Sequence, residues 1–69
     1  MPQTLSLGAV GAAVTELQKA LNGLPSRPAR LATDGIFGQK TRSRVVEFQG
    51  DNGLDPDGVV GPLTWEKLL

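Results

Sequence analysis

The sequence predicts an all-α fold, a compact three-helix bundle built by one domain over residues 1–69. Three observations support it: two stretches with apolar residues at helical spacing, a short apolar stretch that opens with proline, and a turn motif repeated before the helices. With 69 residues, 39% of them hydrophobic, the chain can form one core. It contains no cysteine or histidine, so disulfides and the usual metal ligands cannot stabilise it and close helix packing must.

The first helix is predicted over residues 10–22, where apolar residues recur every three or four positions. The residues of this apolar face are Val10, Val14, Leu17, Leu21 and Leu24. An Asn-Gly pair ends the helix, and we expect Gly23 in the left-handed conformation of a C-cap. The loop over residues 24–33 carries two prolines and should be irregular and exposed.

The second helix is predicted over residues 38–52, with Phe37, Thr41, Val45 and Phe48 on one face. Gly53 should end it in a Schellman motif, in which Leu54 folds back against Phe48.

The third helix is predicted over residues 62–69. Pro62 suits the first helical position, where a missing N–H is harmless. Its apolar face consists of Trp65, Leu68 and Leu69. Two helical turns cannot persist alone, so packing must hold this helix.

A turn motif, Asp-Gly-x-x-Gly-x-x-Thr, occurs at 34–41 and again at 57–64, and a weaker copy begins at Gly8. We expect the Asp-Gly pair to form a tight turn, the apolar residues between the glycines to fill the core, and the second glycine to start the helix without a side-chain clash. The predicted turn residues are Gly8, Gly11, Asp34, Gly35, Gly38, Thr41, Asp57, Gly58, Gly61 and Thr64.

The charges disfavour nucleic acid as a partner. Seven Lys and Arg balance seven Asp and Glu, whereas proteins that bind phosphate backbones carry a basic excess. Cations concentrate between residues 27 and 44 and acids between 47 and 57, which predicts one basic and one acidic side or simply two solvated faces. No stretch resembles a signal peptide or membrane span, so we expect a soluble chain with no membrane contact.

Two acidic residues raise the question of catalysis or metal binding. Because Asp34 and Asp57 recur in matching turns, we expect them to cap backbone N–H groups. A calcium loop through Asp57 would lack acidic ligands at Gly53 and Thr64. Without histidine, cysteine or an acid pair with a base, the chain is predicted to be no enzyme and to hold no metal or cofactor.

The candidate ligand-binding residues are polar groups beside the turns. Gln39, Lys40 and Arg42 open the second helix, whose N-terminal N–H groups attract carboxylates. Further candidates are Arg30, Asn52 and Trp65. A merely solvated surface is the alternative for the polar residues, and core packing is the favoured alternative to sugar stacking for Trp65.

Two glutamines, Gln18 and Gln49, each follow a core residue late in a helix. Their amides are expected to hydrogen-bond the turns, although they could also reach the amide groups of a ligand.

Four motifs in order resemble the type 1 peptidoglycan-binding domain, a three-helix module of cell-wall amidases, muramidases and phage endolysins. The motifs are Leu7-Gly8-x-x-Gly11-x-x-Val14-x-x-Leu17-Gln18-x-x-Leu21-Asn22, then Asp34-Gly35-x-Phe37-Gly38-x-x-Thr41, Val45-x-x-Phe48-Gln49-x-x-x-Gly53-Leu54 and Asp57-Gly58-x-Val60-Gly61-Pro62-x-Thr64-Trp65-x-x-Leu68. The chain departs from the family pattern at Arg44, which stands where the family usually has a small residue, and we expect its head to reach water.

The resemblance implies a non-catalytic, monomeric module that binds glycan strand or stem peptide, located in the cell wall or periplasm or outside the cell. It also implies a covalently linked hydrolase, which the module would hold near its substrate. The alternative is a protein-docking or prodomain-like module on the same fold, which an exposed apolar patch would favour.

Overall fold

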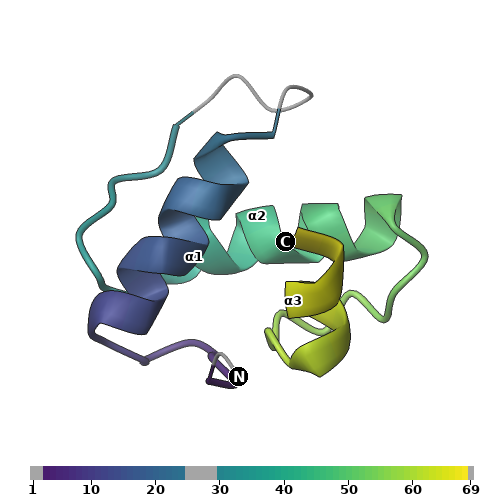
Figure 1. Cartoon of the computed structure of the whole chain (residues 1–69), viewed down its shortest axis with the longest axis horizontal. Coiled ribbons are helices and arrows are strands. Elements are labelled where there is room, and N and C mark those ends of the chain that lie inside the picture. Colours follow the sequence, from purple (N-terminus) through teal and green to yellow (C-terminus); the bar gives the residue numbers. More distant parts are fainter. Residues whose placement is uncertain (1–2, 25–29, 69) are drawn as a thin grey trace.

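The computed structural model describes residues 3–24 and 30–68 and contains three α-helices in that part of the chain. They are α1 (Ala12–Asn22), α2 (Gln39–Asp51) and α3 (Pro62–Leu68). In Figure 1, α1 crosses the N-terminal half of α2, and the short α3 lies against the C-terminal half of α2, where Gln49 bonds Thr64. The described residues form no strand, only two isolated bridges, and the molecule measures 27 × 26 × 20 Å. The predicted all-α three-helix fold is confirmed.

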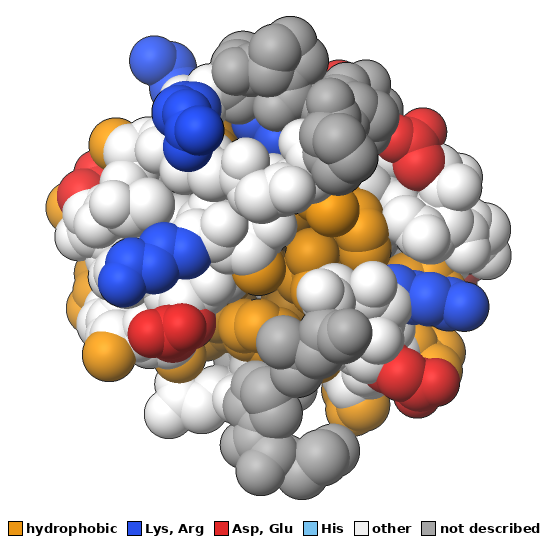
Figure 2. Space-filling view, turned by 45° about the horizontal axis from the view of Figure 1, so that its top comes forward, with side chains coloured by type: hydrophobic (Ala, Val, Ile, Leu, Met, Phe, Trp, Pro, Cys, Tyr) orange, Lys and Arg blue, Asp and Glu red, His pale blue; other side chains and the backbone are white. Residues whose placement is uncertain are grey.

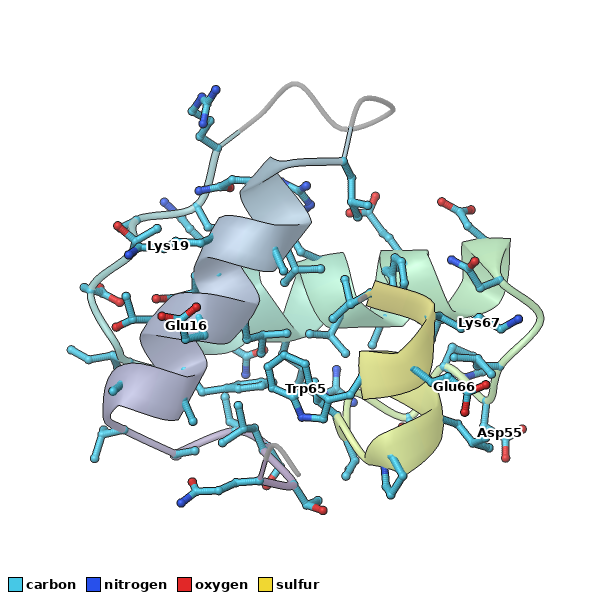
Figure 3. All side chains as sticks on the ribbon, viewed as in Figure 1. Glu16, Lys19, Asp55, Trp65, Glu66 and Lys67 are labelled. Atoms are coloured by element: carbon cyan, nitrogen blue, oxygen red, sulfur yellow. The ribbon has the colours of Figure 1, made fainter. Side chains whose placement is uncertain are left out.

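The core is formed by one apolar cluster that all three helices share. Its buried members are Leu5, Val14, Leu17, Leu21, Phe37, Val45, Phe48, Val60 and Trp65. Figure 3 shows Trp65 of α3 pointing toward the centre of the molecule, between the helices. The helical spacing identified most of these residues, because period 3.6 places them on one face of each helix.

The prediction for both ends of α1 was wrong in part. Val10 precedes the helix, pairs with Ile36 in an isolated bridge and is 73% exposed, so it belongs to no apolar helix face. Gly23 adopts a right-handed conformation, with φ −78° and ψ −7°. Its N–H bonds Lys19 and Ala20 carbonyls, so the chain leaves α1 through a tight right-handed turn that requires no left-handed cap.

The backbone at the end of α2 follows the prediction, whereas the contact of Leu54 with Phe48 stays a prediction. Gly53 has φ +71°, the N–H of Leu54 donates to the Gln49 carbonyl at 2.9 Å, and the N–H of Gly53 donates to the Gly50 carbonyl at 3.3 Å. These are the two hydrogen bonds of a Schellman motif.

We expected the Arg44 guanidinium to extend into water, but the structure shows that it does not. Arg44 is 8% exposed, and its Nη2 donates to the backbone carbonyl of Leu21 at 3.1 Å. The last carbonyls of a helix lack partners within the helix and carry partial negative charge, so the end of α1 can accept a guanidinium from α2.

An N-terminal segment before α1 ties the two Asp-Gly turns together. Leu5 and Val60 exchange backbone hydrogen bonds of 3.0 and 2.8 Å. Further along the segment, the Gly8 N–H donates to Phe37 and the Gly11 N–H donates to Gly35, both at 2.9 Å. The segment therefore crosses both turns and gathers them at one end of the bundle.

The roles of the glycines and of the apolar residues in the two turns differ in part from the prediction. Gly35 and Gly58, the first glycines, have φ +75° and +76°, a conformation that favours glycine. A Cβ on the second glycines, Gly38 or Gly61, would meet nothing within 4 Å, so the avoided clash is not their role.

Of the two apolar residues in each turn, only the second fills the core. Phe37 and Val60 are 1% and 0% exposed, whereas Ile36 and Val59 are 55% and 39% exposed. The two side chains differ because successive residues in an extended segment point to opposite sides.

The face in Figure 2 carries both basic and acidic side chains around exposed apolar surface, so a separation into basic and acidic sides is not seen there. Among the described residues, no helix is long and apolar enough to cross a membrane. Some of our predictions lie outside the described residues: those for the prolines at 25 and 28, for Arg27 and for the contribution of Leu69 to the third apolar face.

Candidate functional site

Gln18, a residue of α1 that is 1% exposed, holds the first Asp-Gly turn (residues 34–41). Its Nε2 donates to the Ile36 carbonyl at 3.0 Å, to Asp34 Oδ1 at 3.2 Å and to Thr41 Oγ1 at 3.2 Å. Its Oε1 accepts the Gly35 N–H at 3.0 Å. The predicted hydrogen bonding of this glutamine to the turn is confirmed.

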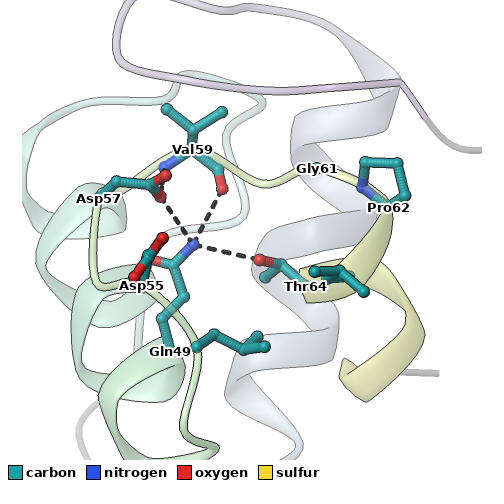
Figure 4. A pocket seen from close by; sticks show the side chains of 9 residues that line it. Gln49, Asp55, Asp57, Val59, Gly61, Pro62 and Thr64 are labelled. Atoms are coloured by element: carbon teal, nitrogen blue, oxygen red, sulfur yellow. Dashed lines mark hydrogen bonds between the residues drawn. The ribbon is translucent and has the colours of Figure 1, made fainter.

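Gln49 of α2, also 1% exposed, makes the equivalent contacts to the second Asp-Gly turn (residues 57–64). Its Nε2 donates to the Val59 carbonyl at 2.9 Å, to Asp57 Oδ1 at 3.2 Å and to Thr64 Oγ1 at 3.1 Å, the three bonds drawn as dashed lines in Figure 4. Its Oε1 accepts the Gly58 N–H at 3.0 Å. A buried primary amide is thus saturated by one turn in each half of the chain.

The aspartates of both turns accept a backbone N–H two residues further on. Asp34 Oδ1 accepts from Ile36 at 3.0 Å, and Asp57 Oδ1 accepts from Val59 at 2.9 Å. The Ile36 N–H, and after it the Gln18 amide, lower the pKa of Asp34 below its ordinary value of 3.8, because both bonds favour the carboxylate.

Each turn borders a small pocket, and the two pockets are lined by matching residues. The first turn pocket, of about 250 Å³, has in its lining Gln18, Asp34, Ile36, Gly38 and Thr41. The second turn pocket, of about 210 Å³, has in the same places Gln49, Asp57, Val59, Gly61 and Thr64.

The two pockets differ where the following helix begins. Gln39 and Lys40 line the first turn pocket, whereas Pro62 and Leu63 stand in their places in the second. The first is therefore the more polar and the more basic at its helix side, which suits a polar or anionic ligand.

A larger cavity of about 400 Å³, the basic cavity, adjoins the first turn pocket. Its lining consists of Arg30, Leu31, Gln39, Lys40, Ser43 and Arg44. Leu31, Gln39 and Lys40 line both the first turn pocket and the basic cavity, so the two adjoin and together make up a depression along the first half of α2. The volume of the basic cavity is within the range of small-ligand sites in proteins.

The depression brings together three of the predicted ligand-binding residues, namely Arg30, Gln39 and Lys40. Arg42 lies elsewhere: a Cβ on Gly58 would be 3.0 Å from its Cγ and Nε, so this side chain covers the second turn. Asn52 caps its own helix, donating from Nδ2 to the Phe48 carbonyl at 2.9 Å.

Trp65 lies in the core. It is 5% exposed, and its Nε1 donates to the Gln3 carbonyl at 2.8 Å, so the favoured core interpretation is confirmed and no ligand contact is proposed for it.

Arg44 and Ser43 are cavity residues that we did not predict from the sequence. Helical spacing contained the signal, because Ser43 follows Gln39 by four residues and Arg44 follows Lys40 by four, which places each pair on one face of α2. Arg44 was overlooked because a cation was expected to point into water. As for metals, no group of three or more acidic side chains in the described ranges, 3–24 and 30–68, could hold an ion.

The chain is a small helical module in which buried glutamines and threonines hold the two Asp-Gly turns, and a depression lies along α2. A family model described as a “putative peptidoglycan binding domain” matches residues 10–68. The chain belongs to this family.

Two of the curated relatives of the chain are much longer enzymes. A zinc D-Ala-D-Ala carboxypeptidase of Streptomyces albus G is 46% identical over 65 residues, which are 94% of this chain and 26% of that enzyme. A spore cortex-lytic enzyme of Oceanobacillus iheyensis is 37% identical over 97% of this chain and 24% of its own length. The chain thus spans about a quarter of these two relatives.

Solved structures agree with this assignment. The structure of a Burkholderia AP3 phage endolysin superposes with a TM-score of 0.85 at 45% identity, over 96% of this chain and 24% of that one. A peptidoglycan-binding protein from Clostridioides difficile gives a TM-score of 0.87 at 37% identity, over 97% and 40% of the two chains.

Proposed function

We propose that this domain binds peptidoglycan without catalysis and holds a linked cell-wall hydrolase at its substrate. The observation that carries the proposal is the depression along α2, lined mainly by polar residues, in a chain whose larger relatives bear the names of cell-wall enzymes. Tethering raises the effective concentration of a catalytic domain, so modest affinity is sufficient. The place of action would be the cell wall.

The wall offers ligands that match this depression. Stem peptides present amides and carboxylates, which the Gln39 amide and the Arg30 and Lys40 cations can bind. Gln39 lies where the first turn pocket meets the basic cavity, so its loss should weaken binding wherever the ligand lies in the depression.

Co-sedimentation with purified sacculi tests the proposal. We expect saturable binding of the wild-type domain, weaker binding of Gln39→Ala, and unchanged binding of Gln3→Ala, which removes an exposed glutamine outside the depression. Insoluble chitin should retain little protein. Absence of the domain from the sacculus pellet would overturn the proposal.

The non-catalytic part is tested separately. Sacculi incubated with the domain alone should release no muropeptides above the level of a buffer control. Release that grows with domain concentration would show that this module cleaves the wall itself.

Protein docking remains the second candidate because of one surface feature. Val10 and Ile36, joined by an isolated bridge, are 73% and 55% exposed and make a small apolar patch. If this patch docks a protein, Val10→Ser should abolish that contact and leave sacculus binding intact. Loss of sacculus binding in Val10→Ser, with the fold preserved, would instead assign the patch to wall binding.

A further inference from the structure

The basic cavity is an open surface hollow whose lining combines three cations. Arg30, Lys40 and Arg44 line it, and none of the acidic side chains that the structure describes is part of its lining. The whole chain has a formal net charge of +0, so this local excess is a property of the cavity and not of the protein. A concave, positively charged site raises the local concentration of anions.

Arg44 is the fixed element of the cavity. It is 8% exposed, and the bond from Nη2 to the Leu21 carbonyl at 3.1 Å holds its guanidinium against the end of α1. A guanidinium held in this way loses little further freedom when it binds a carboxylate, which its planar geometry matches. The position is therefore preorganised for a carboxylate ligand.

Lys40 stands one helical turn before Arg44, on the same face of α2. Like charges four residues apart repel each other, and the positive end of the helix dipole adds to that repulsion at Lys40, in a first turn that has no acidic residue. An anion bound in the cavity would relieve both interactions, whereas a neutral ligand would relieve neither.

A glycan strand is the poorer ligand for this surface. The chain has three aromatic residues, two Phe and one Trp, and all are buried: Phe37, Phe48 and Trp65 are 1%, 6% and 5% exposed. No aromatic ring is therefore available to stack on a sugar. Neutral N-acetyl sugars would also displace water from three cations without offering them a counter-charge.

We infer that the basic cavity binds a free carboxylate of the peptidoglycan stem peptide, with Arg44 as the fixed contact and Arg30 and Lys40 as mobile ones. The inference rests on the proposed function and names the part of the wall that is recognised. It implies that the domain distinguishes stem peptides with free carboxylates from those in which the carboxylates are amidated.

Titration of the isotope-labelled domain with two synthetic peptides tests the inference. One is L-Ala-γ-D-Glu-meso-diaminopimelate-D-Ala, and the other is the same peptide with its carboxylates converted to carboxamides. We expect the free acid to shift the amide signals of residues 39–44 saturably and the amide form to bind at least about tenfold more weakly, because charge-assisted bonds to the guanidinium are lost. Raising the salt concentration should weaken only the free acid's binding.

Variants of the exposed cations avoid unfolding the bundle. We expect Lys40→Gln and Arg30→Gln to weaken binding of the free acid about fivefold each, the loss of one partly exposed charge contact. Lys67→Gln is the matched control, since it removes an exposed lysine from α3, outside the cavity, and should change nothing. Arg44→Gln should have the largest effect, provided that its amide spectrum retains the dispersion of the wild type.

The outcomes separate this inference from the proposed function. Equal affinity for both peptides, or no binding to either while sacculi still retain the domain, would overturn the carboxylate site and leave wall binding intact. Failure to bind sacculi would overturn the proposed function itself.

Discussion

Gln18 and Gln49 make the same four hydrogen bonds, each to its own Asp-Gly turn, although they lie on different helices. Sixteen positions separate Gln18 from Asp34, and eight separate Gln49 from Asp57. The two glutamines therefore make the same contacts with their turns, although the chain between glutamine and turn is twice as long in the first half. Each turn is held by a buried amide from the preceding helix, so the depression beside the first turn depends on α1 as much as on α2.

Loss of either glutamine should destabilise the domain. Gln18→Ala leaves the Gly35 N–H without its acceptor and the Thr41 hydroxyl without a buried donor, and it opens a small cavity. We expect a loss of about 3 kcal/mol in the free energy of unfolding, a large share of the total for a chain of this size.

Urea unfolding followed by circular dichroism measures this loss, with Gln3→Ala, an exposed glutamine, as the control. Gln49→Ala should behave like Gln18→Ala. A change below about 1 kcal/mol in both would mean that water replaces the amide contacts without loss.

Alanine should be tolerated at Gly38 and not at Gly35. Gly35 has φ +75°, and a Cβ there would lie 3.0 Å from Thr15 Oγ1 and 3.1 Å from the Gly11 carbonyl oxygen. Left-handed strain and crowding together should cost about 2–3 kcal/mol. Gly38 has φ −103° and open space around it, so Gly38→Ala should stay within about 0.5 kcal/mol of wild type. Thermal unfolding of both variants compares them directly, and equal melting temperatures would contradict this account.

Stability should depend on pH through Asp34. Its pKa in the folded state is lowered by the Ile36 N–H and the Gln18 amide, so the unfolded chain takes up the proton at higher pH than the folded chain. The stabilisation is therefore present above the ordinary pKa of 3.8 and is lost as pH falls through that value toward the lower folded pKa.

Asp34→Asn keeps the hydrogen-bond acceptor and removes the titration. Between about pH 5 and about pH 3, the urea midpoint of this variant should fall less than that of wild type. Parallel curves for the two proteins would show that Asp34 contributes nothing to the acid sensitivity.

The fluorescence of Trp65 should not respond to wall fragments. The ring is 5% exposed and hydrogen-bonded to the Gln3 carbonyl, away from the basic cavity lining. We expect a blue-shifted emission maximum that resists iodide quenching, that stays constant when muropeptides bind and that moves to the red in urea. A ligand-induced shift with sugar fragments would place a sugar-stacking site at Trp65 after all.

Much of the fold could be predicted because its determinants are local. Helical spacing located all three helices to within two residues, and the Gly53-Leu54 pair correctly indicated a Schellman motif. The prediction was wrong where the apolar spacing of a helix continued into residues outside that helix. Val10 fits the apolar period of α1, yet it lies in the extended segment that pairs with Ile36. Periodicity alone cannot tell a helix from the chain that leads into it.

The candidate site was predictable only in part. The start of α2 pointed to Gln39 and Lys40, since helix N-termini and neighbouring cations attract anions. Arg42 was grouped with them by proximity in sequence, but its side chain lies over Gly58. Helices separate adjacent residues by about 100°, so neighbours in sequence often serve different surfaces.

The sequence by itself determined the helices, the duplicated turns and the membership of a wall-binding family, because these depend on residue types at short, regular spacings. Tertiary structure decided which polar groups are saturated and which line a cavity. The Arg44 head is held by Leu21, 23 positions away, and the Trp65 ring is held by Gln3, 62 positions away. The partners of a side chain depend on which segment folding brings against it. When that segment lies far away in the sequence, a local pattern of residues cannot predict the contact.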